Sequence, residues 1–145
     1  MRQHEAMGSL SAAASVRLPV RLHGIQLGRP TDLLVDVESW HAVGFVVRCG
    51  DDSVRFLPWA ASQPLADQIA VGSALMLLED VDFYKRRSVS FRSIVGGEIP
   101  LGGVLRDVYV GEGGAVTELE IERDGELRRI PPAGTRVAPT RATAA

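Results

Sequence analysis

Several residue types that mark particular classes of protein are scarce in this chain of 145 residues. Cys49 is the single cysteine, which excludes an internal disulfide and any metal site built from several cysteines. Its position beside a predicted β-turn indicates an unreactive, half-buried thiol. Lys85 is the single lysine, and the formal net charge is only −2. A balance this close to neutral disfavours nucleic acid or an anionic membrane as the partner.

Long hydrophobic runs are also missing. The longest, residues 69–78, has about half of the roughly 20 apolar residues that a membrane-spanning helix needs. Residues 1–15 contain Glu5 and lack the continuous apolar segment of a signal peptide. These features predict a cytoplasmic protein without a transmembrane segment. Residues 1–15 are small and polar without periodicity, so we expect a flexible tail, order beginning near Val16, and near-neutral deletion of residues 1–14.

The most informative feature present is a diverged repeat, in which residues 31–59 resemble residues 105–131. Each copy places an aspartate, Asp32 or Asp107, before a short apolar strand. A turn, an alternating second strand and an acidic loop follow, and each copy ends at a proline, Pro58 or Pro131. Upstream, residues 19–28 align with residues 93–102 at a constant offset. The repeat predicts two similar structural units.

Short strands joined by glycine and aspartate turns predict an all-β protein made of small barrels. Asp124 and Gly125 form the strongest hairpin signal, whereas Gly28 to Pro30 indicates a break between strands. A unit of about 60 residues is marginally stable alone, so the two units are expected to pack together with pseudo-two-fold symmetry. The predicted organisation is a disordered tail (1–15), a first unit (16–80), a short helical connector (81–87), a second unit (88–138) and a disordered tail (139–145).

The pattern resembles the PRC-barrel domain family. The similarity lies in the apolar strand at 33–36, the strand at 43–47, the Gly-Asp loop at 50–52 and the Phe-Leu-Pro-Trp at 56–59, and as a tandem pair it covers about residues 16–138. The resemblance implies small β-barrels that act as adaptors, as in the photosynthetic reaction-centre H subunit, a ribosome maturation factor that binds a small-subunit protein, and archaeal cell-division proteins. This chain lacks the H subunit's transmembrane helix and a recognisable N-terminal domain of the maturation factor, so neither specific role transfers.

Trp40 and His41 lie at a predicted hairpin tip, where small or polar residues are usual. An exposed Trp40 would be a partner anchor, because tryptophan is enriched at interface hot spots. In that case Trp40→Ala leaves the fold intact and weakens partner capture. The alternative, which the general burial of tryptophan favours, is that Trp40 folds back on its hairpin or covers the core of the other unit. Trp59 follows Pro58 and is expected to be a packing residue.

The predicted connector combines aromatic and basic residues. One interpretation is a docking patch for an acidic partner or an RNA backbone. The other is a connector helix in which Phe83 is turned inward and the charged side chains are solvated. Arg92, Arg128 and Arg129 extend the patch only if the fold brings them together. The predicted partner-binding set is Trp40, His41, Phe83, Tyr84, Lys85, Arg86 and Arg87.

No arrangement of residues indicates catalysis, a metal site or a cofactor. Asp32 and Asp107 are better explained as caps that accept backbone N–H bonds than as a catalytic or metal-binding pair. The glycine-rich runs at 96–97 and 111–114 read as β-turns, because neither has a phosphate-loop ending or a following helix. His4, His23 and His41 lie in a tail, a turn region and a hairpin tip, with no nucleophile and orienting acid arranged around them as a catalytic set.

The sequence therefore favours a non-enzymatic adaptor that acts through protein–protein contact. An RNA- or ribosome-associated assembly factor and a small-ligand or metal-binding barrel, with a cavity between the two units, are the alternatives. Homodimerisation through an exposed strand edge stays open.

Overall fold

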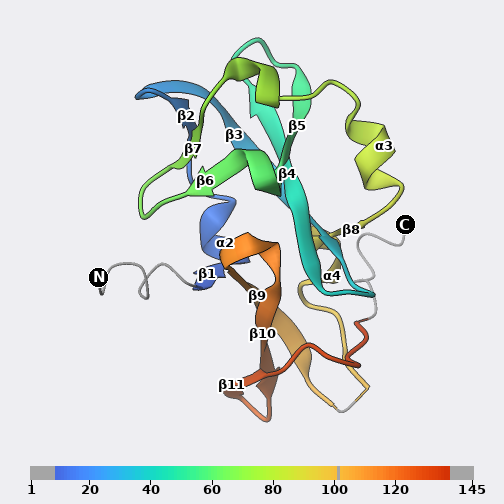
Figure 1. Ribbon diagram of the computed structural model, residues 1–145. Helices are drawn as coiled ribbons and strands as arrows, with labels where there is room; N and C mark the ends of the chain where they lie inside the picture. The colour runs from blue at the N-terminus through green and yellow to red at the C-terminus, as the bar shows by residue number, and fades with distance from the viewer. Residues whose placement is uncertain (1–8, 101, 138–145) are drawn as a thin grey trace.

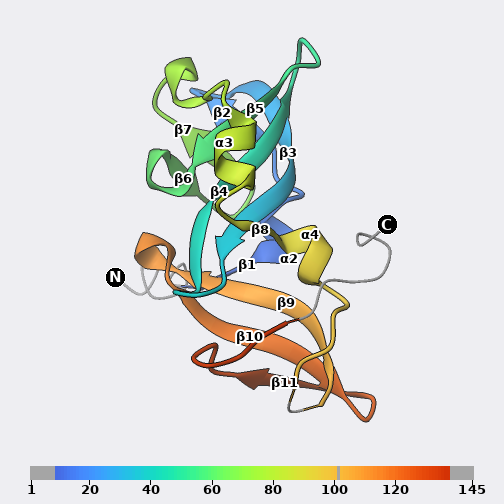
Figure 2. The ribbon, with the colours of Figure 1, turned by 90° about the vertical axis from the view of Figure 1, so that its right-hand side faces the viewer.

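The structure is a computed structural model that describes residues 9–100 and 102–137 (Figures 1 and 2). Strands make up 50% of the structure and helices 17%, which confirms the predicted all-β class. The strands form two sheets, of which the larger is curled into a half-barrel.

The larger sheet has the strand order β5-β4-β3-β2-β7-β6, and β8 also pairs with β3. Its strands are β2 (Val20–Leu22), β3 (Ile25–Asp36), β4 (His41–Cys49), β5 (Val54–Pro58), β6 (Ser62–Pro64), β7 (Ile69–Val71) and β8 (Val89–Ser90). β3, β4 and β5 form an antiparallel meander. β3 runs unbroken through Pro30, where the pairing with β4 shifts register, so the break predicted at Gly28 to Pro30 is wrong.

The second sheet has the order β1-β9-β10-β11 and is antiparallel throughout. Its strands are β1 (Ser9–Ser11), β9 (Val104–Gly111), β10 (Val116–Arg123) and β11 (Glu126–Ile130). The hairpin predicted at Asp124 and Gly125 is confirmed. Both residues have positive φ, of 55° and 80°, which matches the tight turn that aspartate and glycine accommodate.

The helices are short and connect or cap the sheets. The α-helices are α2 (Ala12–Ser15), α3 (Val81–Lys85) and α4 (Phe91–Ile94), and the 3-10 helices are η1 (Trp59–Ala61), η2 (Ala74–Met76) and η3 (Glu112–Gly114).

The prediction of a flexible tail is wrong for residues 9–15. β1 pairs with β9, with Leu10 opposite Val110, and Ala12 and Ser15 in α2 are buried. The sequence concealed this because α2 packs through small residues that show no hydrophobic periodicity. The rest of the predicted N-terminal tail, residues 1–8, and the predicted tail at 139–145 lie outside the described residues.

Two short segments, β1–α2 and β8–α4, each consist of a strand followed by a helix. A serine–aspartate contact joins each of these strand–helix segments to a distant strand. The Ser11 hydroxyl donates to the Asp107 carboxylate, whose Oδ1 also accepts from the backbone N–H of Ala13 at 3.0 Å and of Val108 at 2.8 Å. The predicted capping role of this aspartate is confirmed.

The same set of bonds recurs at Asp32. The Ser90 hydroxyl donates to the Asp32 carboxylate, whose Oδ1 accepts from the N–H of Arg92 at 3.1 Å and of Leu33 at 2.8 Å. Thus β1 and α2 join the second sheet, whereas β8 and α4, placed in the second unit by the sequence, join β3 of the larger sheet.

Burial does not support the upstream alignment of residues 19–28 with 93–102. That alignment pairs Ile25 with Ile99, but Ile25 is 68% exposed and Ile99 only 5% exposed. It also pairs Val20, in a strand, with Ile94, in a helix.

One hydrophobic core is continuous across the two sheets. It contains Phe45 and Leu57 of the larger sheet together with Val108, Leu119 and Ile121 of the second sheet, all fully buried. A smaller cluster lies beneath α3, on the opposite face of the β3-β4-β5 meander. The two sheets therefore stabilise each other.

Candidate functional site

Trp40 is buried, so the prediction that it is an exposed partner anchor is wrong. Its side chain is 4% exposed, and the indole Nε1 donates to the backbone oxygen of Thr135 at 3.3 Å. Its backbone has a φ of 54°, in the left-handed region, and its carbonyl accepts from Val116 N at 2.9 Å. Trp40 therefore covers the shared core where the β3–β4 turn meets β10.

The β3–β4 turn is fixed by Asp36. Its Oδ1 accepts from the backbone N–H of Glu38 at 2.9 Å and of Ser39 at 3.3 Å. These bonds, that from Ser39 first, lower the pKa of the Asp36 carboxyl below its ordinary value. A turn held in this way directs the Trp40 ring toward the core.

His41 is exposed but also contacts the second sheet. Its Nε2 lies 3.1 Å from the carbonyl oxygen of Gly113. The neighbouring Gly114 has a φ of 96°, and a Cβ there would lie 3.0 Å from the Trp59 ring and 3.2 Å from the His41 ring. Trp59 stacks on Phe45 with ring centroids 5.6 Å apart, in the packing role expected of it. His41 and Trp59 thus seat the β9–β10 turn.

The helix α3 is anchored to the larger sheet by its inner side. Asp80 caps it by accepting from Phe83 N at 3.3 Å, and Val81 is buried. The Tyr84 ring stacks on Phe56 with centroids 3.9 Å apart and an interplanar angle of 12°. The inward aromatic residue is therefore Tyr84, whereas the alternative reading of the connector placed Phe83 inward.

The outer side of α3 presents Phe83 beneath Arg87. The Phe83 side chain is 39% exposed, and its ring meets Tyr84 edge-on with centroids 5.0 Å apart. The Arg87 guanidinium lies 3.8 Å from the Phe83 ring centroid and donates to the Phe83 carbonyl at 3.1 Å. This cation–π pair is held in place by contacts within the chain itself. We call Phe83, Lys85, Arg86 and Arg87 the α3 patch.

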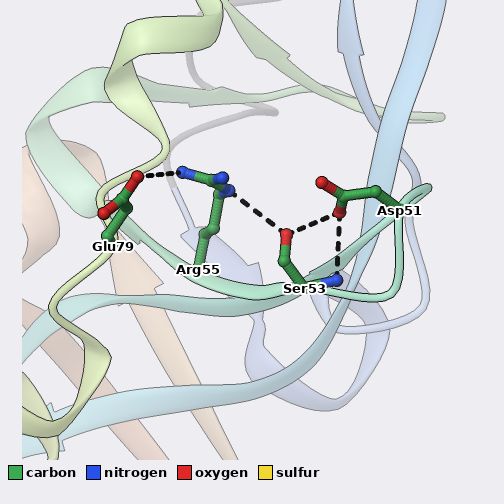
Figure 3. Close-up of polar contacts among 4 residues, drawn as sticks. All are labelled: Asp51, Ser53, Arg55 and Glu79. Atoms are coloured by element: carbon green, nitrogen blue, oxygen red, sulfur yellow. Dashed lines mark hydrogen bonds and ion pairs between the residues drawn. The ribbon is translucent and has the colours of Figure 1, made fainter.

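Acidic side chains flank the start of the same helix. Arg55 links the helix approach to the β4–β5 hairpin: it donates to Glu79 at 3.4 Å and, through Nε, to the Ser53 hydroxyl at 3.3 Å (Figure 3). Asp51 accepts from the Ser53 hydroxyl at 2.6 Å and from its N–H at 3.0 Å, which lowers the pKa of the Asp51 carboxyl. The network braces the segment that leads into α3.

The structure separates the predicted partner-binding residues into two places. Trp40 belongs to the shared core, whereas Tyr84 packs against the cluster beneath α3. Arg128 and Arg129 lie on β11 of the other sheet, where they pair with Glu126 at 3.3 Å and Glu118 at 3.2 Å. They do not extend the α3 patch.

A cleft of about 350 Å³ lies where the two sheets meet. Its lining combines apolar and polar side chains from β1, η1, β6 and the residue after it, the end of β9 and η3: Leu10, Trp59, Gln63, Leu65, Val110 and Glu112. Sequence reasoning anticipated a cavity between the units but not these residues. Leu10 was missed because it lay in the expected tail.

Within residues 9–100 and 102–137, no three His, Cys, Asp or Glu side chains gather in a way that would hold a metal ion. None of the helices in that part of the chain has the length and apolar character needed to span a bilayer. The chain matches no model of a known protein family, and no curated protein matches it.

Proposed function

We propose that this chain is a non-enzymatic, cytoplasmic adaptor built from two PRC-barrel-like units, and that it binds an acidic protein partner through the α3 patch. The tandem arrangement is supported by the matching serine–aspartate contacts at Asp32 and Asp107. It is also supported by the presence of one three-stranded meander in each sheet. In two such units related by a pseudo-two-fold axis, the strand–helix segment that precedes each unit would pack against the meander of the other unit. Here β1–α2 packs against β9 and β8–α4 packs against β3.

The observation that carries the adaptor role is the preformed Phe83–Arg87 pair. Arginine and aromatic residues dominate interface hot spots, and a side chain that is already ordered loses less entropy on binding. A guanidinium held over a ring also keeps donors free for a carboxylate. The surface therefore suits an acidic, partly apolar protein segment.

The RNA-binding alternative has less support. Glu79, Asp80 and Asp82 precede Lys85 and Arg86 in the same short segment, and Lys85 lines one surface hollow together with these three carboxylates. Nucleic-acid affinity depends on several phosphate contacts, which neighbouring carboxylates oppose.

A test is affinity capture from native cells with the full chain as bait, with and without nuclease. Phe83→Ala and Arg87→Ala should each lose the captured proteins, because each removes one half of the pair. Arg48→Ala is the matched control, since Arg48 is an exposed arginine paired with Asp52 at 4.0 Å on the β4–β5 hairpin. Equal capture by all variants would contradict the proposed surface.

A second candidate function, small-ligand binding, is favoured by the cleft beside Trp59. A ligand bound only to the native state would raise the melting temperature in a ligand panel. Ligand-induced stabilisation that is lost in Leu65→Asp would support this reading, and the absence of any stabilising ligand would argue against it.

A further inference from the structure

The strand β11 forms the open edge of the second sheet. Among the described residues, β10 is its one strand partner. Glu126, Leu127, Arg128 and Arg129 are exposed, and Leu127 is 61% exposed. An edge strand with an exposed apolar residue offers unpaired backbone groups to a further strand.

The corresponding edge of the larger sheet is covered at one position. β5 is the third strand of its meander, as β11 is of the other. Phe56 of β5 exchanges two backbone hydrogen bonds of 2.8 Å with Leu78, on the side away from β4. Phe56 is paired with Val46 of β4, and Arg129 is paired with Glu120 of β10. Phe56 and Arg129 thus hold corresponding positions in the two meanders. No strand bonds Arg129 in this way within the described chain.

The backbone groups at this edge point outward in a defined pattern. β11 begins directly after the two-residue turn, with Arg123 opposite Glu126. Hydrogen-bonded and non-bonded pairs alternate in an antiparallel ladder that closes on such a turn. The N–H and C=O groups of Leu127 and Arg129 are therefore directed to the open edge, in agreement with the outward bonds of Phe56.

The side chains of β11 match a second copy of the same strand. Antiparallel self-pairing centred on Leu127 sets Leu127 opposite its counterpart, so that the outward N–H and C=O groups of the two Leu127 residues meet, while Arg129 lies opposite Gly125 in the turn of the second copy. It also sets Glu126 opposite Arg128 of the second copy, and Arg128 opposite Glu126. If the two-fold axis passed through Arg128 or Arg129 instead, two arginines would face each other across the pair of strands. An axis through Glu126 would set two glutamates face to face. Like charges directly opposite one another are unfavourable.

We propose that two copies of this chain associate through β11, paired antiparallel about a two-fold axis at Leu127. The pairing extends the four-stranded sheet into a continuous eight-stranded sheet across the dimer. Pairing one short strand buries less surface than the roughly 1,200 Å² that is typical of stable, specific interfaces. Association is therefore weak and depends on concentration. This dimer does not depend on the adaptor function, because it uses the other sheet.

Sedimentation equilibrium of the full chain tests the pairing. The wild-type average mass should rise toward that of a dimer as concentration increases. Glu126→Arg and Arg128→Glu should each remain monomeric, because each sets like charges opposite one another. An equimolar mixture of the two variants should associate again, since every pair across the axis is then of opposite charge.

The control is Arg48→Glu, which reverses an exposed charge on the larger sheet and should associate as the wild type does. Thermal unfolding of every variant establishes that it is folded. A wild-type chain that stays monomeric at its highest soluble concentration would overturn the proposal. So would a single variant that dimerises like the wild type, or a mixture of folded variants that stays monomeric.

Discussion

At the scale of single residues, the most consequential side chain is Asp107. It is a 7%-exposed carboxylate that accepts hydrogen bonds from Ser11, Ala13 and Val108. A buried carboxylate is stable only when its oxygens are paired in this way. Asp107 thereby ties the N-terminal segment to β9.

We predict that Asp107→Ala lowers the free energy of unfolding by about 2–3 kcal/mol, because it leaves buried donors without an acceptor. Chemical denaturation measures the change. Glu38→Ala is the control, since Glu38 is exposed on the β3–β4 turn and should change stability little. An Asp107→Ala protein as stable as the wild type would show that the contact is dispensable.

Trp40→Ala should unfold at a much lower temperature than the wild type, with a loss of about 3–5 kcal/mol, because it opens a large void in the shared core. Differential scanning calorimetry gives the shift. Phe83→Ala removes a partly exposed ring and should cost much less. A mild effect of Trp40→Ala would indicate that the β3–β4 turn repacks.

Tyr109 makes the free energy of unfolding depend on pH in the alkaline range. Burial, followed by the negative charges of Glu120 and Asp107, raises the pKa of the Tyr109 phenol, and Arg129 partly opposes this effect. A group with a raised folded-state pKa stabilises the fold fully below its unfolded pKa of about 10 and loses that contribution as pH rises through the folded value.

Tyr109→Phe should therefore lose less stability than the wild type between about pH 8 and pH 11. Urea unfolding at the two pH values provides the comparison. Equal losses in the two proteins would show that the Tyr109 phenol contributes nothing to the alkaline decline.

At the scale of elements, the strand–helix segment at residues 9–15 carries more of the fold than its composition indicates. Removing it would expose the β9 edge and leave the Asp107 carboxylate without the Ser11 and Ala13 donors. The expectation from sequence, near-neutral deletion of residues 1–14, is thereby reversed.

A chain beginning at Val16 should be less stable by several kcal/mol than one beginning at Ser9, because it loses strand pairing, the buried Ala12 and the aspartate contact. Thermal unfolding of the two truncated proteins gives the difference directly. Equal melting temperatures would contradict a structural role for β1 and α2.

The elements that sequence predicted correctly have strong local signals. The Asp124–Gly125 turn and the alternating strands around it are examples, since turn chemistry and side-chain alternation are local properties. The burial of Trp40 and Leu10 depends on Val116, Thr135 and Val110, which are far away in the chain. The sequence therefore left an exposed and a buried Trp40 both open, with burial favoured, and it placed Leu10 in a tail. Recognising the β11 edge required knowing that, among the described residues, this strand has a neighbour on one side only, which is a property of topology.

At the scale of the whole molecule, the two meanders have different outer faces. In the larger sheet, Leu34, Val46 and Phe56 form an apolar face that α3 covers. In the second sheet, Arg129 lies over Tyr109 at 3.9 Å, next to Glu118 and Glu120, and the face is polar. Only the outer face of the larger sheet needs a helix to cover it, and α3 does so. The α3 patch and the β11 edge therefore lie on different sheets.

The measurement that tests the central claim most directly is quantitative capture from native cells by the wild type, Phe83→Ala, Arg87→Ala and the Arg48→Ala control, after nuclease treatment. The adaptor account predicts a set of acidic proteins retained by the wild type and Arg48→Ala and lost from both α3-patch variants. A set that is identical for all four baits, or that disappears with nuclease, would contradict it.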